Sequence, residues 1–235
     1  MKIIVPLAGP DFEAGDGTLK AEIPVEGRPL LRSALETRPW WTSGVASDAD
    51  LVFILKRTER AMRFADTTLS AWYPRARVAL ISDYTGGAAL SALAGLALVA
   101  QAEEPVVIDL ADILYDSNVD LSRWFDVDQR WGALALTFPS DNPAYSYLSF
   151  DTAGLFLEAA EKQIISVHAS AGTYVFRSPA LLLRAIAHSL DNRSALTHKG
   201  LFFVCPLFNG VKAVGENVAM AGVANIRDLK VHPQR

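Results

Sequence analysis

The chain has 235 residues, of which 51% are hydrophobic and 20% are charged. This composition supplies enough apolar surface for a core and excludes most disordered classes of protein. The length predicts one large domain over residues 1–235. The formal net charge is −4, so the chain lacks the basic excess that is typical of nucleic-acid-binding proteins, and we expect no nucleic-acid partner.

The single cysteine, Cys205, permits no intramolecular disulfide, which is typical of a reducing compartment. The segment 1–7 holds one cation and a very short apolar run, so we expect no signal peptide. The most apolar stretch, 88–100, is interrupted by Ser91 and is shorter than the roughly 18 to 20 residues that span a bilayer. The sequence therefore predicts a cytoplasmic protein without a membrane partner.

In the first half of the chain, short apolar runs alternate with helical patterns. The predicted helices lie at 30–37, 59–72 and 87–101, and the predicted strands at 3–5, 51–55, 77–81 and 106–108. Strands that are apolar throughout and joined by crossover helices indicate an α/β fold, with a parallel sheet covered on both faces. In such sheets ligands bind beyond the carboxyl ends of the strands, which places the candidate site in the loops after Leu7, Ile81 and Ile108.

After Gly132 the pattern changes to strand-like segments separated by turn residues, at 133–138, 145–150, 155–158 and 173–176. These segments predict mixed or antiparallel strands. A helix is expected at 179–190, and an apolar segment follows at 201–208. The carboxyl-terminal tail has no readable pattern.

The loop after the first predicted strand contains Gly9, Gly15, Gly17 and then Lys20. Glycines at a strand end bring backbone N–H groups close to phosphate, and a lysine supplies a positive charge. Such a loop also fits a simple connection with a solvated lysine, because short motifs of this kind are common.

Further motifs follow this loop in a fixed order. They are LKAEIPVEGRPLL at 19–31, TGGAA at 85–89, Asp112, YSY at 145–147, EK at 161–162, GTYVF at 172–176 and PLFN at 206–209. In their order and approximate spacing they resemble the sugar-phosphate nucleotidyltransferases. The similarity is greatest to the small bacterial members of the glucose-1-phosphate thymidylyltransferase type, which are linked to capsule and surface-polysaccharide synthesis. It covers nearly the whole chain.

The resemblance implies a mixed, mainly parallel sheet with helices on both faces, the Rossmann-like GT-A arrangement of nucleotide-diphospho-sugar transferases. It implies a reaction in which a sugar-1-phosphate oxygen attacks the α-phosphorus of a nucleoside triphosphate and pyrophosphate leaves. Catalysis of this kind is mainly alignment and neutralisation of phosphate charge, and no covalent nucleophile is needed. The implied partners are these two substrates, and the implied cofactor is Mg²⁺.

The resemblance also implies a role for each matching residue. Lys20 would contact the triphosphate, Lys162 would hold the sugar phosphate, and Asp112 would anchor Mg²⁺. The remaining residues would line the two ligand pockets: Gly9, Thr85 and Gly87 on the nucleotide side, and Ser146, Glu161 and Gly172 on the sugar side.

Individual residues also have simpler explanations. Asp112 fits a turn cap, the 161–162 pair fits an exposed charge pair of little energetic weight, and Gly87 fits a helix N-cap. Each simpler explanation is the more common one for a single residue. The functional interpretation rests on all of them occurring together and in order.

The chain departs from the family pattern in its first loop and near its end. Gly9-Pro10-Asp11-Phe12-Glu13 stands where the family has a glycine-rich phrase with an arginine, and the residue after Lys20 is Ala21 rather than a neighbouring proline. Pro10 removes one backbone N–H, and carboxylates near a triphosphate cost electrostatic energy unless Mg²⁺ intervenes. The segment 224–229 offers no second metal ligand.

Two other functions therefore remain as alternatives. The first is a catalytically impaired relative that binds a nucleotide or nucleotide sugar in a regulatory or assembly role. The second is a glycosyltransferase that uses Asp126-Val127-Asp128 as its metal-binding motif, although this segment is helix-like and fits a solvated acidic face. The four histidines lack zinc-site spacing. The abundance of tryptophan and phenylalanine leaves a homodimer open.

Overall fold

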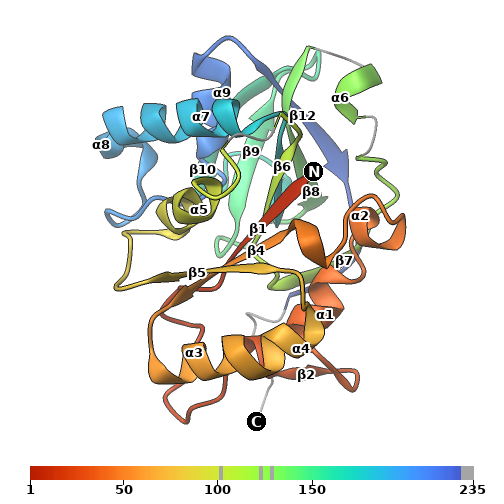
Figure 1. Ribbon diagram of the computed structural model, residues 1–235. Helices are drawn as coiled ribbons and strands as arrows, with labels where there is room; N and C mark the ends of the chain where they lie inside the picture. The colour runs from red at the N-terminus through yellow and green to blue at the C-terminus, as the bar shows by residue number, and fades with distance from the viewer. Residues whose placement is uncertain (101–102, 122–123, 128–129, 229–235) are drawn as a thin grey trace.

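The computed structural model describes residues 1–100, 103–121, 124–127 and 130–228 (Figure 1). Its main sheet has nine strands in the described part of the chain, in the order β10-β9-β11-β6-β1-β4-β5, with β8 pairing to β11 and β12 to β8. The strands of this sheet are β1 (Lys2–Pro6), β4 (Leu51–Lys56), β5 (Arg77–Ile81), β6 (Val106–Asp109), β8 (Trp131–Pro139), β9 (Ser146–Phe150), β10 (Phe156–Glu161), β11 (His168–Phe176) and β12 (Asn217–Gly222).

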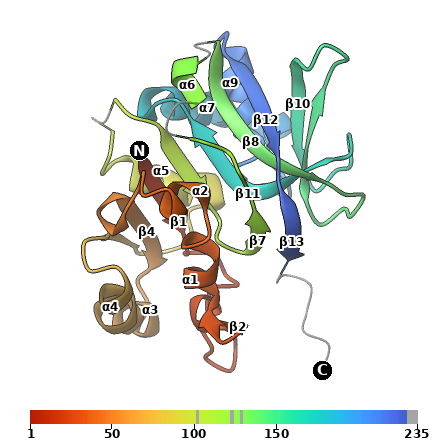
Figure 2. The ribbon, with the colours of Figure 1, turned by 90° about the vertical axis from the view of Figure 1, so that its right-hand side faces the viewer.

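Two small antiparallel sheets complete the strands. One pairs β7 (Ile113–Asp116) with β13 (Ala224–Asp228), side by side in Figure 2. The other pairs β2 (Pro24–Val25) with β3 (Arg28–Pro29).

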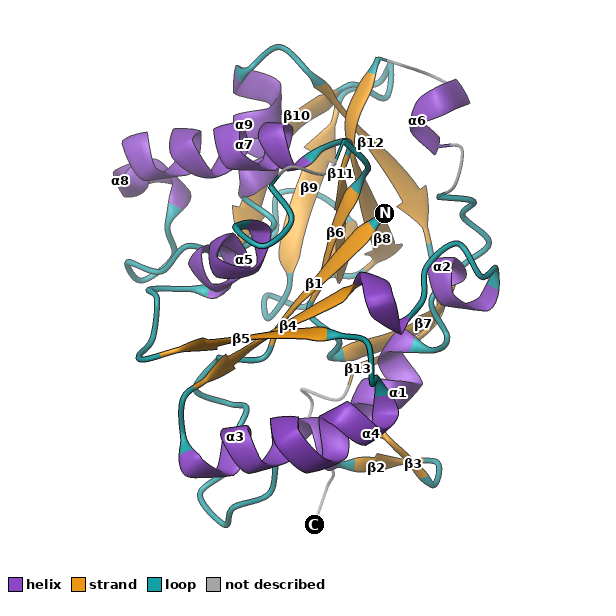
Figure 3. Cartoon of the chain, in the orientation of Figure 1, coloured by secondary structure: helices purple, strands orange, loops and turns teal. Residues whose placement is uncertain are grey.

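The first half of the chain forms the predicted parallel sheet, in which β5, β4, β1 and β6 are neighbours. Its strands are apolar throughout because both faces are buried, with Ile3 in the core on one face and Ile4 in the core on the other. Helices cover both faces (Figure 3). On the Ile3 face lie α1 (Leu30–Leu35), α2 (Pro39–Thr42), α3 (Glu59–Phe64), a π-helical turn (Ala65–Leu69) and α4 (Ser70–Trp72); on the Ile4 face lie α5 (Ala88–Leu96), α7 (Pro179–Asp191) and α9 (Leu207–Ala213).

The second half of the chain adds antiparallel strands to this sheet. β11 pairs antiparallel with β6, β8 and β9, so one long strand joins the two halves. The remaining helical segments are short: α6 (Trp124–Val127), α8 (Arg193–Leu196) and the 3₁₀ turns Lys20–Glu22 and Asp48–Asp50. The α/β fold class and its mixed, mainly parallel sheet are confirmed.

Some segments differ from the sequence prediction. The helix predicted over 87–101 ends at Leu96, because Leu98 and Val99 donate to carbonyls three rather than four residues earlier; its last residue, Gln101, lies outside the described residues. In the tail without a readable pattern, the described residues up to 228 include β12 and β13, and residues 229–235 lie outside the described part of the chain. No helix in the described part of the chain is long and apolar enough to cross a bilayer.

The open edge of β10 is covered by α9. The Asn209 amide donates from Nδ2 to the Ala159 carbonyl at 2.8 Å and accepts the Ala159 N–H at Oδ1 at 2.9 Å. Lys212 donates from Nζ to the Leu157 carbonyl at 2.8 Å. Side chains thus occupy peptide groups that no neighbouring strand reaches.

Candidate active site

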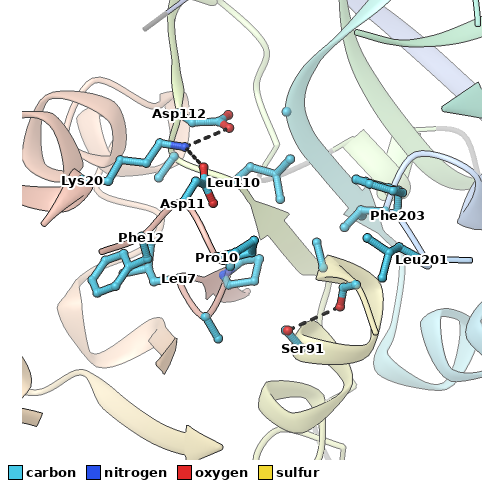
Figure 4. Close-up of a pocket in the computed structure, with 18 of the residues that line it drawn as sticks. Leu7, Pro10, Asp11, Phe12, Lys20, Ser91, Leu110, Asp112, Leu201 and Phe203 are labelled. Carbon is cyan, nitrogen blue, oxygen red and sulfur yellow. Dashed lines mark hydrogen bonds and ion pairs between the residues drawn. The ribbon is translucent and has the colours of Figure 1, made fainter. Parts of the chain in front are cut away.

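A cavity of about 830 Å³ opens beyond the carboxyl ends of β1 and β6, where the connections of the parallel sheet diverge to opposite sides. Figure 4 shows part of its lining. All nine candidate residues of the sequence line this cavity: Gly9, Lys20, Thr85, Gly87, Asp112, Ser146, Glu161, Lys162 and Gly172. Segments more than 160 residues apart in the chain therefore share one site, as the collinear motifs require.

The loop after β1 folds back on itself, so that Lys20 lies next to the residues at the start of the loop. Glu13 and Leu19 form an antiparallel bridge, and the Lys20 N–H donates to the Phe12 carbonyl at 2.9 Å. The Phe12 ring is buried and packs edge-on against Phe64 of α3, with ring centroids 5.9 Å apart. This packing anchors the loop to the Ile3 face of the sheet, so the lysine lies beside the glycine turn.

The Lys20 ammonium lies between two carboxylates (Figure 4). Its Nζ is 2.6 Å from Asp11 Oδ2 and 3.7 Å from Asp112 Oδ2. The Asp112 side chain is only 8% exposed, whereas that of Asp11 is 66% exposed. The sequence identified Lys20 and Asp112 as site residues, but it did not place Asp11 in contact with the lysine.

The short connection that carries Asp112 is fixed at both of its ends. On one side, the Asp109 carboxylate accepts the Ala111 N–H at 2.8 Å and holds Ala111 at φ +52°. On the other side, Arg38 Nη2 donates to the Ile113 carbonyl at 2.9 Å. A non-glycine residue at positive φ is strained, so these bonds stabilise a turn that the backbone would not adopt unaided.

Arg38 and Asp109 form a fully buried ion pair next to this turn. Nε and Nη2 of Arg38 donate to the two carboxylate oxygens at 2.8 and 3.1 Å, and its Cζ lies 3.9 Å from the Tyr115 ring centroid. Thr173 donates to Asp109 at 2.9 Å. Burial is the largest single influence and lowers the pKa of the Arg38 guanidinium, but the charges of Asp109, Tyr115 and Asp112 and the hydrogen bond to Asp109 together outweigh it, so the pKa is raised. Sequence reasoning missed this pair, because residues 71 positions apart carry no local signal.

The turn before α5 forms the opposite wall of the cavity. Gly86 and Gly87 have φ values of +86° and +133°, and a Cβ on Gly87 would lie 2.1 Å from the Phe202 carbonyl oxygen. The Phe202 N–H donates to the Gly86 carbonyl at 2.9 Å, so a distant segment packs on the glycines. Thr85 Oγ1 lies 2.7 Å from Ser91 Oγ of α5. Gly87 is also the N-cap residue of α5, as its simpler explanation predicts.

The antiparallel half of the sheet supplies the remaining polar groups. Ser146 of β9 and Glu161 of β10 are paired across the two strands, and the Ser146 hydroxyl donates to the Glu161 carboxylate. Lys162 follows directly at φ +53°, with Nζ 5.5 Å from the Phe203 ring centroid. The cavity thus has one lysine from each half of the sheet.

Gly172 lies in an irregularity of β11, where the pairing with β8 shifts between Ser170 and Tyr174. Its φ is +78°, and an added Cβ would lie 3.4 Å from Asp112 Oδ1. The Gly172 carbonyl accepts the Leu110 N–H at 2.9 Å. Gly172 therefore lies against the carboxylate of Asp112, and it links the central turn to the antiparallel half.

The oxygen donors at the cavity wall fit the ligand preferences of Mg²⁺. Magnesium is commonly held by one or two carboxylates, with substrate phosphates and water completing its shell. Asp112 is a hard oxygen donor at the cavity wall, and Asp11 lies on the other side of the same lysine. Within the described residues no group of three or more His, Cys, Asp or Glu side chains could form a metal cage. The residues present fit an ion shared with a phosphate ligand.

The structure describes the competing acidic motif only in part. Asp126 is exposed in α6 and is not part of the cavity lining, and Asp128 lies outside the described residues. Cys205 is buried, and burial raises the pKa of its thiol, so it stays protonated and unreactive at neutral pH.

No protein-family profile matches the chain, and no curated protein matches it in sequence. Solved structures match it closely in fold. A nucleoside-diphosphate-sugar pyrophosphorylase from Vibrio cholerae RC9 superposes with a TM-score of 0.79 at 19% identity, over 97% of this chain and 95% of that chain.

Two further structures extend the comparison. A Bacillus anthracis protein assigned as a glucose-1-phosphate thymidylyltransferase, in complex with sucrose, gives a TM-score of 0.74 at 17% identity, over 99% of this chain and 91% of that chain. A UDP-glucose pyrophosphorylase in complex with UDP-glucose gives 0.67 at 14% identity, over 95% of this chain and 90% of that chain. The chain has the fold of nucleotide-sugar pyrophosphorylases, which is the fold that the sequence motifs implied.

Proposed function

We propose that the protein is a nucleotidyltransferase that joins a nucleoside triphosphate to a sugar-1-phosphate and forms a nucleotide sugar. One observation carries this proposal: the Lys20, Asp112 and Lys162 side chains, which come from three distant motifs, line a single cavity at the carboxyl ends of the parallel strands. The shared fold supports the reaction class, because the structures it resembles are pyrophosphorylases of nucleotide sugars.

In the proposed reaction, a phosphate oxygen of the sugar-1-phosphate attacks the α-phosphorus. A new P–O bond forms, the bond between the α-phosphorus and its bridging oxygen breaks, and pyrophosphate leaves with that oxygen. Lys20 neutralises charge on the triphosphate, and Lys162 holds the sugar phosphate. These contacts act by alignment and by charge stabilisation in a site that excludes part of the water.

Asp112 is the proposed ligand of Mg²⁺, with the substrate phosphates as the other ligands. When bound, the ion neutralises phosphate charge that develops as pyrophosphate departs. The Asp109 and Arg38 bonds that fix the neighbouring turn keep the Asp112 carboxylate in place before substrate arrives. Thr85 and Gly87 are proposed to contact the base, and Ser146, Glu161 and Gly172 the sugar.

Pyrophosphate release tests this function directly. The protein is incubated with Mg²⁺ and a panel of nucleoside triphosphates and sugar-1-phosphates, and turnover is expected with at least one pair. Asp112→Asn and Lys20→Ala should each lower kcat/KM by at least about a hundredfold. Asp116→Asn is the control for the carboxylate, because Asp116 ends β7 and does not line the cavity, and this variant should retain activity.

A second function is favoured by the contact between Asp11 and Lys20, which occupies the proposed triphosphate-binding cation. On this alternative the protein binds a nucleotide or nucleotide sugar without turnover. Calorimetry that detects binding while the full panel yields no pyrophosphate would support it. Pyrophosphate release by the wild-type protein would exclude it.

A further inference from the structure

The loop after β1, which borders the cavity, contributes a negatively charged group, the Asp11 carboxylate. The Asp11 carboxylate lies 2.6 Å from Lys20 Nζ through Oδ2. Its other oxygen folds back over the glycine turn, so close that a Cβ on Gly9 would lie 2.7 Å from Oδ1. Asp11 therefore occupies the lysine ammonium that the proposed function assigns to a phosphate, and it also covers the bare backbone of Gly9.

The charges around Lys20 leave little attraction for a further anion. One ammonium already faces two carboxylates, those of Asp11 and Asp112. Pro10, directly before Asp11, offers no backbone N–H to offset them. A polyphosphate that enters here meets like charge within a few ångströms, and this repulsion is screened only in part in a cavity.

The two carboxylates differ in their freedom to respond. The Asp112 side chain is 8% exposed and follows a turn fixed by Asp109 and Arg38, whereas the Asp11 side chain is 66% exposed. Asp11 can therefore leave the lysine, or share a cation with an incoming phosphate, without burying a new charge. In either case, a bound divalent cation offsets the negative charge of the Asp11 carboxylate.

We propose that Asp11 is a specificity-determining residue that competes with phosphate for Lys20 and makes polyphosphate binding depend on a divalent cation. This inference rests on the proposed function only in assigning Lys20 to phosphate. It predicts that the site discriminates by charge: cation-complexed polyphosphate is accepted, and the same anion without a cation is rejected.

Calorimetric titration of the full chain with inorganic pyrophosphate and with tripolyphosphate tests the proposal without knowledge of the base or the sugar. In metal-free buffer, Asp11→Asn should bind both anions at least about tenfold more tightly than the wild type. With saturating Mg²⁺ the advantage should shrink to less than about threefold, because the cation then supplies the missing positive charge. Asp11→Ala should behave in the same way.

Asp16→Asn is the matched control. Asp16 is an exposed carboxylate of the same loop, and it accepts the Thr18 N–H at 2.8 Å rather than facing the lysine. An asparagine oxygen can accept the same bond, so this variant removes one charge and keeps the turn. Its affinity should stay within about twofold of the wild type. Lys20→Met in the Asp11→Asn background should abolish the gain.

Several outcomes overturn the proposal. Equal affinity of wild type and Asp11→Asn in metal-free buffer does so, as does an advantage that Mg²⁺ leaves unchanged, an equal gain in Asp16→Asn, or no detectable binding to either protein. The result is distinguishable from failure of the proposed function. If the substrate panel yields no pyrophosphate while Asp11→Asn gains affinity, the transferase reaction is wrong and the role of Asp11 stands.

Discussion

Two ion pairs flank Asp112, and they differ in solvation. Arg38 and Asp109 are both 0% exposed, and the carboxylate accepts hydrogen bonds from Arg38, Thr173 and the Ala111 backbone. Lys20 and Asp11 are 22% and 66% exposed and are joined by one contact. Asp109 is the last residue of β6 and Arg38 lies directly before α2, whereas Asp11 and Lys20 follow β1 and line the cavity.

The difference shows how surroundings decide what an ion pair does. A buried pair cannot separate, because each charge would be left without water or a partner, so it fixes the backbone around it. An exposed pair separates at little cost, because water replaces the partner. The first pair therefore holds the turn of Asp112, and the second leaves Lys20 available for exchange with a ligand.

The largest effect is expected from Arg38→Met. It leaves the Asp109 carboxylate buried without its main partner, which should lower the free energy of unfolding by about 3–5 kcal/mol. Urea denaturation followed by circular dichroism measures this loss. The double variant Arg38→Met/Asp109→Leu removes both charges and should recover part of the stability, but not all of it, because the Ala111 N–H and the Thr173 hydroxyl then lose their acceptor. A single variant as stable as the wild type would show that the buried pair does not act as described.

A smaller effect is expected from Thr173→Val. The Thr173 hydroxyl donates to Asp109 at 2.9 Å and lies 2.7 Å from the Tyr115 hydroxyl, so valine leaves two buried groups short of a bond. The free energy of unfolding should fall by about 1–3 kcal/mol. Thr67→Val is the control, because that hydroxyl is exposed and donates to the Arg63 carbonyl of the same helical segment. Equal losses in the two variants would contradict a special role of the buried network.

The smallest effect on stability is expected from Lys20→Met. The partly exposed pair with Asp11 contributes little, and the 3.7 Å separation between Lys20 Nζ and Asp112 is too long for a hydrogen bond. The free energy of unfolding should therefore change by less than about 1 kcal/mol, while binding of polyphosphate in the presence of Mg²⁺ is lost. Thermal unfolding and calorimetry measure the two quantities on the same sample. A loss of stability as large as that of Arg38→Met would remove the distinction between the pairs.

The sequence predicted the parallel half of the fold more completely than the rest. Strands such as 51–55 are buried on both faces and therefore read as continuous apolar runs. β12 and β13 escaped prediction because they are partly exposed, β12 at an edge of the main sheet and β13 in the two-stranded sheet with β7, and their residue pattern is weak. The site residues could be named in advance because their motifs are local phrases in a fixed order.

The contacts between these motifs could not be predicted. That Asp11 reaches Lys20 depends on the Glu13–Leu19 bridge, and that Arg38 reaches Asp109 depends on how α2 packs on the sheet. Both are properties of the folded chain rather than of a local phrase. The departure of the first loop from the family pattern did, however, include Asp11. This is the residue that is proposed to make polyphosphate binding depend on a divalent cation.

The amide of Asn209 has a consequence for how copies of the protein meet. A terminal strand with bare peptide groups is a template on which another molecule can extend the sheet. The Asn209 side chain hydrogen-bonds both the N–H and the carbonyl of Ala159, as a neighbouring strand would. Lys212 hydrogen-bonds the Leu157 carbonyl, two residues earlier. Continuous sheets that run from one molecule to the next through β10 are therefore obstructed, which protects this edge against aggregation.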